Sequence, residues 1–165
     1  PDARHVLALG RQAEGSAGYT LQRITVADGT TQEIASGLWL SDVALSPDGL
    51  WVSYMVSLDR EHPESNGIWV APTEAGRVAP VKLELPGAYR WRNNNRLVYV
   101  PQLPGAPSRA LLQFDPLVGK SSILLDPTDL AIRIADNDWS LSPDGRFLAF
   151  RAEEDRCIWL LELPE

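Results

Sequence analysis

Side chains that could do chemistry are few in this chain and lie far apart. Histidine occurs twice, His5 near the start of a strand-like segment and His62 in a charged run, and neither has a nucleophile at a recognised spacing. The segment Gly15-Ser16-Ala17-Gly18 departs from the Gly-x-Ser-x-Gly nucleophile elbow and favours a flexible hairpin loop. We therefore predict no catalytic residue and a non-enzymatic protein.

Metal and cofactor chemistry is equally weakly represented. Asp136-Asn137-Asp138 begins like a calcium loop, but Trp139 follows where a further oxygen ligand and a glycine should stand. The single Cys157 cannot form an internal disulfide, and its apolar neighbours favour a buried, inert thiol. We expect no metal site and no cofactor.

Composition excludes some partners and favours one fold class. The net charge of -7 and the lack of a basic stripe argue against nucleic acid as a partner. No stretch approaches the roughly 20 apolar residues of a membrane span. Thirteen prolines, twelve glycines and six tryptophans favour turns and strands over long helices. The start at Pro1 carries neither an initiator methionine nor a signal peptide, and we expect that an upstream piece was removed.

A repeated pentapeptide indicates the turns and strands that would position any site. Leu-Ser-Pro-Asp-Gly stands at residues 45–49 and again at 141–145, each time between apolar, β-branched or aromatic runs. Proline presets φ, aspartate bonds nearby backbone amides, and glycine takes a positive φ, so the motif predicts a tight hairpin. The structural turn residues are Pro47, Asp48, Gly49, Pro143, Asp144 and Gly145.

A third, weaker copy extends the repeat through the chain. Residues 96–100 match the runs that follow the two pentapeptides, about 50 residues from each, with Asn93-Asn94-Asn95 at the turn. Asparagine tolerates the left-handed backbone, so the hairpin can survive. About four strands per unit of 40 to 50 residues is typical of propeller blades. We predict fourteen strands in one region, residues 1–165, with approximate blades 1–37, 38–85, 86–130 and 131–165.

With its turns and strands, the chain resembles the Pro-Asp, WD-like propeller repeat. This repeat occurs in the bacterial Tol propeller and in the propeller domains of prolyl oligopeptidase-type peptidases. The resemblance implies an all-β fold, a β-propeller segment of about four blades, two complete and two partial, that is not a closed ring alone. Either the chain is a fragment of a longer protein, or a second copy or partner pairs with its open blade edges.

In such a propeller, candidate binding residues lie on the face opposite the Pro-Asp-Gly turns. That face carries the loops from second to third strand and from one blade to the next, here residues 10–18, 57–66, 84–89, 102–109, 126–137 and 153–156. The candidate residues are Asp59, Arg60 and His62 in the longest, most charged loop, and Arg90, Arg92 and Arg133 near inner strands. The alternative is that these charges only keep the surface soluble.

The tryptophans bear on what could bind. Five of the six fall in predicted strands, where a core role is favoured, while Trp39 lies near a blade junction and is more open to a surface role. Our leading hypothesis is a protein- or peptide-binding module of a larger bacterial extracytoplasmic protein. The alternatives are the substrate-gating propeller of a serine peptidase and a carbohydrate-binding propeller, which would need two indoles on the loop face.

Overall fold

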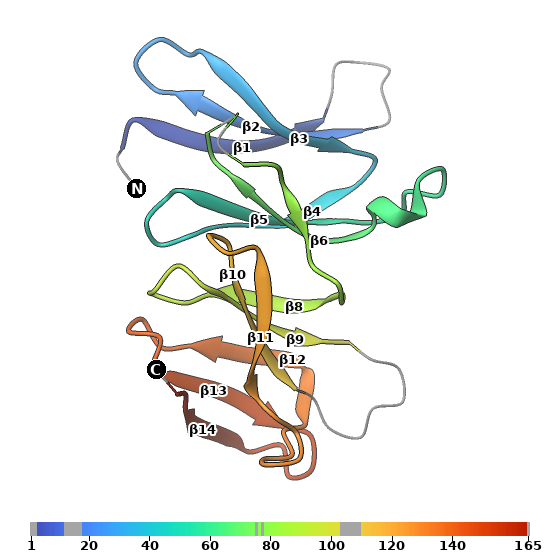
Figure 1. The fold of residues 1–165 in the computed structure, drawn as a ribbon, viewed down its shortest axis with the longest axis vertical. Coiled ribbons are helices and arrows are strands. Elements are labelled where there is room, and N and C mark those ends of the chain that lie inside the picture. Colours follow the sequence, from blue (N-terminus) through green and yellow to red (C-terminus); the bar gives the residue numbers. More distant parts are fainter. Residues whose placement is uncertain (1–2, 12–17, 75, 77, 103–109, 165) are drawn as a thin grey trace. The chain divides into compact units, whose positions relative to one another are not determined.

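The computed structural model describes residues 3–11, 18–74, 76, 78–102 and 110–164, and of Asp136 only the backbone. This part of the chain consists of antiparallel strands and one short 3-10 helix, η1 (Pro63–Ser65) (Figure 1). The strands are β1 (His5–Arg11), β2 (Tyr19–Thr25), β3 (Thr31–Gly37), β4 (Leu40–Leu45), β5 (Trp51–Val56), β6 (Gly67–Pro72), β7 (Val81–Lys82), β8 (Gly87–Trp91), β9 (Leu97–Pro101), β10 (Leu111–Asp115), β11 (Lys120–Leu125), β12 (Ile134–Leu141), β13 (Phe147–Ala152) and β14 (Ile158–Glu162). The all-β prediction is confirmed.

The chain divides into two compact units, residues 1–84 and 85–165. In the first unit, β1-β2-β3 form a three-stranded sheet and β4-β5-β6-β7 a four-stranded one. Leu21 from the first sheet packs with Val52 and Tyr54 from the second, and all three side chains are at most 4% exposed. Burial raises the pKa of Tyr54 to about 12, so its hydroxyl stays protonated in the core.

The second unit repeats this plan. Strands β8-β9-β10-β11 form a sheet of four, and β12-β13-β14 a sheet of three in which β14 is an edge strand. Its core joins Val98 and Leu111 of the larger sheet to Trp139 and Leu148 of the smaller one. Strand β13 alternates buried and half-buried side chains, as expected when one side of a sheet packs on a neighbour, whereas β9 is buried throughout.

The repeated pentapeptide forms the same hairpin turn in both units. Asp48 Oδ1 accepts hydrogen bonds from the Ser46 hydroxyl (2.6 Å) and the Leu50 amide (2.9 Å), while Gly49 adopts φ +74°. Asp144 accepts the same two bonds, from the Ser142 hydroxyl and from the Arg146 amide. The bond from Ser142, followed by that from Arg146, holds the pKa of the Asp144 carboxyl below its usual range. The repeated aspartate and glycine are thus accounted for by turn geometry.

The asparagine turn performs the same task with different atoms. Asn95 takes the left-handed φ of +60° that glycine takes in the other two turns. The side-chain oxygen of Asn94 accepts from the Arg96 amide at 3.2 Å, as the aspartate does in the pentapeptide. The hairpin between β8 and β9 therefore keeps its register without a glycine.

Two local expectations need correction. Cys157 is exposed, because it lies in the connection before β14, where Asp155 Oδ1 holds its amide at 2.9 Å. Trp159 is 53% exposed because it lies outside the core between the two sheets of its unit. Strand β7 has only two residues, and residues 126–130 form a hydrogen-bonded turn within the loop predicted at residues 126–137.

Within the described ranges, no helix is both long and apolar enough to cross a membrane.

Candidate binding surface

The strands of residues 1–84 have two functionally different ends. At one end, here called the turn end, lie the Pro-Asp-Gly turn and the turn between β2 and β3. At the other, the loop end, β1 stops at Arg11, β4 begins at Leu40, and residues 57–66 connect β5 to β6. In Figure 1, η1 projects from this connection beyond the strands. Residues 57–66, the longest and most charged of the loops predicted from the sequence, thus lie at the loop end.

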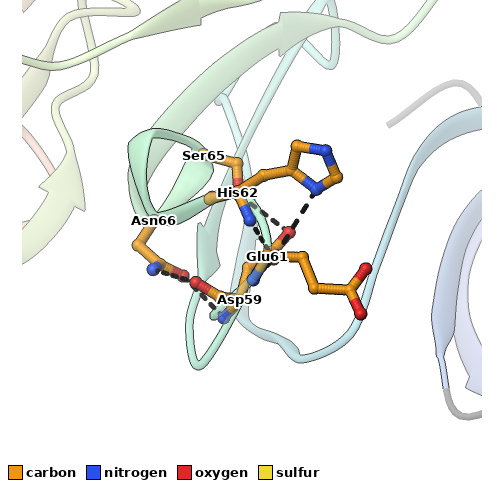
Figure 2. Close-up of polar contacts among 5 residues, drawn as sticks. All are labelled: Asp59, Glu61, His62, Ser65 and Asn66. Atoms are coloured by element: carbon orange, nitrogen blue, oxygen red, sulfur yellow. Dashed lines mark hydrogen bonds and ion pairs between the residues drawn. The ribbon is translucent and has the colours of Figure 1, made fainter.

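Asp59 organises the loop from inside (Figure 2). Its Oδ1 accepts hydrogen bonds from the amides of His62 (2.8 Å) and Glu61 (3.1 Å), and its Oδ2 accepts from the Ser65 hydroxyl (3.1 Å). The bond from the His62 amide, followed by that from Ser65, holds the pKa of the Asp59 carboxyl below its usual range. Asp59 is therefore an ionised structural acceptor, and its side chain is only 21% exposed.

Asn66 closes the loop at its base (Figure 2). Its side-chain oxygen accepts from the Asp59 amide at 3.0 Å, and its side-chain nitrogen donates to the Asp59 carbonyl at 2.9 Å. One amide side chain thus mimics a strand neighbour and joins the two stems of the loop. We call residues 59–66 with this pair of bonds the clamped loop.

Two further contacts fix the clamped loop to its sheet. Trp69 Nε1 donates to the Ser65 carbonyl at 2.7 Å, and Lys82 Nζ donates to the Glu64 carbonyl. Gly67, the residue after the clamp, adopts φ +139°, and a Cβ there would stand 2.8 Å from Lys82 Cε. The loop end of β6 therefore requires glycine.

The clamped loop presents its other side chains to solvent. Arg60, Glu61 and His62 are exposed, and the His62 side chain is 68% exposed, with Nδ1 3.9 Å from Asp59 Oδ1. Just before the loop, Leu58 is 64% exposed and adopts φ +60°, an uncommon conformation for a residue with a branched side chain. An apolar side chain held outward on a fixed backbone suits contact with a partner.

An aromatic group lies beside the clamped loop at the same end of the strands. Trp39 contacts Tyr19 edge to face, with ring centroids 5.3 Å apart, and the Arg11 guanidinium lies 5.9 Å from the Tyr19 centroid. The Ser57 amide donates to the Trp39 carbonyl at 3.0 Å, which ties this group to the loop. Trp39 remains 46% exposed.

These residues lie at the loop end of the strands, where Leu38 is also exposed. We group Arg11, Tyr19, Leu38, Trp39, Leu58 and the clamped loop as a candidate surface and call it the aromatic-loop surface. Tryptophan, tyrosine and arginine are the residue types that most often dominate binding energy at protein interfaces. Sequence reasoning singled out Asp59, Arg60, His62 and, more weakly, Trp39. It included Arg11 and Leu58 only within the predicted loops 10–18 and 57–66, and it missed Tyr19, which the pairing of β2 with β3 brings close to Trp39.

The three other predicted arginines lie in residues 85–165. Arg90 is exposed, donates to the Tyr89 carbonyl at 2.7 Å and lies 5.3 Å from the Trp139 ring centroid. Arg133 is exposed at the loop end of its unit, with Nη1 3.4 Å from Glu154 Oε1.

Arg92 lies at the turn end of its unit, with only 4% of its surface exposed. Its guanidinium donates to the carbonyls of Gly145 (2.7 Å) and Pro164 (2.8 Å) and to Gln113 Oε1 (3.2 Å). Burial lowers the pKa of this guanidinium from its usual value. Arg92 therefore stabilises the fold and does not belong to the aromatic-loop surface.

The other candidate residues from the sequence do not come together as a site within the described part of the chain. Asp138 Oδ2 lies 3.3 Å from Arg151 Nε, and among the described residues no group of three or more His, Cys, Asp or Glu side chains could hold a metal ion. Residues 15–17 of the glycine-serine segment and residues 103–109 of another predicted loop lie outside the described residues.

Comparison with known proteins identifies the fold but not the family. No family model and no curated protein sequence matches the chain. TolB from Acinetobacter baumannii is 14% identical, with a TM-score of 0.58 over 100% of this chain and 41% of its own. The β-propeller domain of the Trilobed protease from Pyrococcus furiosus, described as having an open velcro topology, is 11% identical, with a TM-score of 0.63 over 98% of this chain and 52% of its own.

An oligogalacturonate lyase solved with manganese is also similar, at 17% identity and a TM-score of 0.52 over 90% of this chain and 55% of its own. The chain thus spans about half the length of the structures it matches. Its fold is that of a β-propeller segment, and the resemblance to Tol-type propellers is confirmed at the level of fold.

Proposed function

We propose that this chain is a non-enzymatic β-propeller module that binds a protein or peptide through the aromatic-loop surface. One observation carries the proposal. A loop fixed from inside by Asp59 and Asn66 stands beside an exposed indole, Trp39, and an exposed leucine, Leu58.

The fixed backbone matters for affinity. Ordering a mobile loop on binding costs free energy, and a loop whose backbone is already held avoids most of that cost. Exposed apolar side chains at the centre of such a surface are then free to be buried by a partner, while Arg60, Glu61 and His62 supply a polar rim.

The proposal includes a larger protein around the chain. We take residues 1–165 as one propeller region with blades near 1–37, 38–85, 86–130 and 131–165, completed by further blades or by pairing through open edges. The likeness to Tol-type propellers supports a bacterial extracytoplasmic location. Fractionation of source cells that carry a tagged chromosomal copy tests this. Recovery of the tag with cytoplasmic markers would contradict it.

Selection from a random peptide library tests the binding role directly. Peptides enriched on the immobilised wild-type chain should lose at least tenfold in affinity on Trp39→Ala and on Leu58→Ala, since burial of either side chain is worth at least about 1.5 kcal/mol. Trp159→Ala is the matched control, because Trp159 is similarly exposed, at 53%, but lies on β14. Equal affinity for all four proteins would refute the proposed surface.

A carbohydrate ligand is the second candidate, because two indoles, Trp39 and Trp159, are about half exposed. The same experiment separates the two candidates when an oligosaccharide array replaces the peptide library. Glycan binding that is lost on Trp39→Ala or on Trp159→Ala would favour carbohydrate. The peptidase-gate alternative predicts a Gly-x-Ser-x-Gly hydrolase domain in the same gene, which its sequence would reveal.

A further inference from the structure

A pocket of about 230 Å³ opens at the turn end of residues 1–84, away from the aromatic-loop surface. It lies between strands β1 and β2 of the first sheet and the Pro-Asp-Gly turn of the second. Its walls include His5, Leu7, Arg23, Leu45, Leu50 and Glu74. The pocket combines one largely buried cation with aliphatic walls.

Arg23 is the polar centre of the pocket. Its side chain is only 17% exposed, and one guanidinium nitrogen, Nη2, makes all of its polar contacts to the described residues. This nitrogen lies 3.0 and 3.1 Å from the two ring nitrogens of His5 and 3.7 Å from Glu74 Oε1. The donors on Nη1 and Nε therefore have no partner among the described residues.

Glu74 holds Arg23 only loosely. Its side chain is 48% exposed, and 3.7 Å is too long for a good charge-assisted hydrogen bond. A ligand carboxylate that reaches Nη1 and Nη2 together would form two such bonds at about 2.8 Å, which makes it a stronger partner than Glu74.

The part of the pocket wall formed by the pentapeptide turn and the end of β6 is held by hydrogen bonds and carries two leucines. The Thr73 hydroxyl donates to the Gly49 carbonyl at 2.8 Å, and the Thr73 amide donates to the Leu50 carbonyl at 2.9 Å. These bonds fix the pentapeptide turn against the end of β6. Leu45 and Leu50, which are 37% and 46% exposed, stand where an aliphatic group of a ligand would cover them.

The charges that line the pocket and the volume of the pocket restrict the class of ligand that it can hold. The carboxylates of Asp48 and Glu74 line the same pocket as Arg23, so a doubly charged anion such as phosphate would meet repulsion from both. A volume of 230 Å³ is below the usual range for drug-sized ligands, about 300 to 1,000 Å³. A monocarboxylate with a short aliphatic body meets about half of this repulsion and fits this volume better than a larger ligand.

We infer that this pocket binds the carboxylate of a small aliphatic acid, with the acid group on Arg23 and the aliphatic body against Leu45 and Leu50. Two sources share this chemistry: a free acid and the last residue of a peptide with a free carboxyl terminus. The inference is independent of the proposed function, because the pocket and the aromatic-loop surface lie at opposite ends of the strands.

Amide-shift titration of the ¹⁵N-labelled chain tests the inference with three probes: 4-methylpentanoate, the tripeptide Gly-Gly-Leu, and its carboxyl-terminal amide. We expect the Gly49 and Thr73 amides to shift with at least one carboxylate and not with the amide. Tighter binding of the tripeptide would identify a peptide terminus as the source, and tighter binding of 4-methylpentanoate a free acid. Equal shifts with the amide, or no shift with any probe, would overturn the inference.

Variants connect binding to the proposed contacts. Arg23→Gln should weaken the better carboxylate at least tenfold, the loss expected for two charge-assisted hydrogen bonds. Glu74→Gln should strengthen it by up to about fivefold, because it removes a competitor whose ion pair is worth at most about 1 kcal/mol. Arg133→Gln, which also removes an arginine loosely paired with a glutamate, is the matched control. Unchanged affinity in both Arg23→Gln and Glu74→Gln would refute the site, and Glu74→Gln decides alone should Arg23→Gln fail to fold.

Discussion

Replacement of Arg92 by methionine separates a structural arginine from a binding one. The sequence offers Arg92 as a candidate for ligand contact, whereas in the structure its guanidinium makes three hydrogen bonds inside residues 85–165. A net value of about 1 to 1.5 kcal/mol for each bond gives about 3 to 4.5 kcal/mol in total. Methionine restores apolar contact and removes the cost of burying a cation, so we expect a net loss of about 2 to 4 kcal/mol.

Urea denaturation followed by tryptophan fluorescence measures this loss, because Trp139 is buried in the same core. Arg96→Met is the matched control. Arg96 lies in the same turn, its side chain is 42% exposed, and its pair with Asp115, at 3.4 Å, is worth less than about 1 kcal/mol. A loss for Arg92→Met no greater than for Arg96→Met would refute the reasoning. So would loss of peptide binding without loss of stability, since it would make Arg92 a contact residue.

Further predictions concern the clamped loop, β6 and the last strand. Folding lowers the pKa of Asp59, so the bonds that its carboxylate accepts should persist above the ordinary carboxyl pKa of 3.8 and be lost as the pH falls through the lower folded pKa. The amide chemical shifts of Glu61 and His62 report this loss. Loss of the bonds above pH 5 would contradict the prediction. Gly67→Ala should destabilise the chain by about 1 to 3 kcal/mol in urea titration, whereas Gly10→Ala, where a Cβ meets nothing within 4 Å, should change stability much less. Leu160→Lys, on an edge strand where Leu160 is 69% exposed, should reduce any self-association seen by light scattering; an unchanged mass would exclude β14 as the contact. Cys157 should react with Ellman's reagent in native buffer as fast as in urea.

Sequence reasoning succeeded where the cause of a structure is local. Asp48 and Gly49 shape their turn through bonds that span two or three residues, and Asn94 and Asn95 do the same in the degenerate copy. Such interactions are contained in the order of the letters. The strand pattern followed from the same turns, since each fixes where a hairpin begins.

Features that depend on distant neighbours could not be predicted in this way. Trp139 and Trp159 stand in similar apolar runs, yet one is 5% and the other 53% exposed, because only the first lies on a strand covered by the neighbouring sheet. Similarly, Tyr19 and Trp39 are 20 residues apart, and the pairing of β2 with β3 brings them together. A pattern of residue types does not contain this information.

The clamp between Asp59 and Asn66 makes the segment between them exchangeable. Asn66 binds the backbone of Asp59, Asp59 binds backbone amides, and Trp69 and Lys82 reach backbone carbonyls at positions 65 and 64. Apart from the bond of the Ser65 hydroxyl, none of these hydrogen bonds involves a side chain of residues 60–65. Evolution or a protein engineer can therefore rewrite the sequence of this segment, and with it the specificity of the surface, while the geometry of the scaffold stays the same.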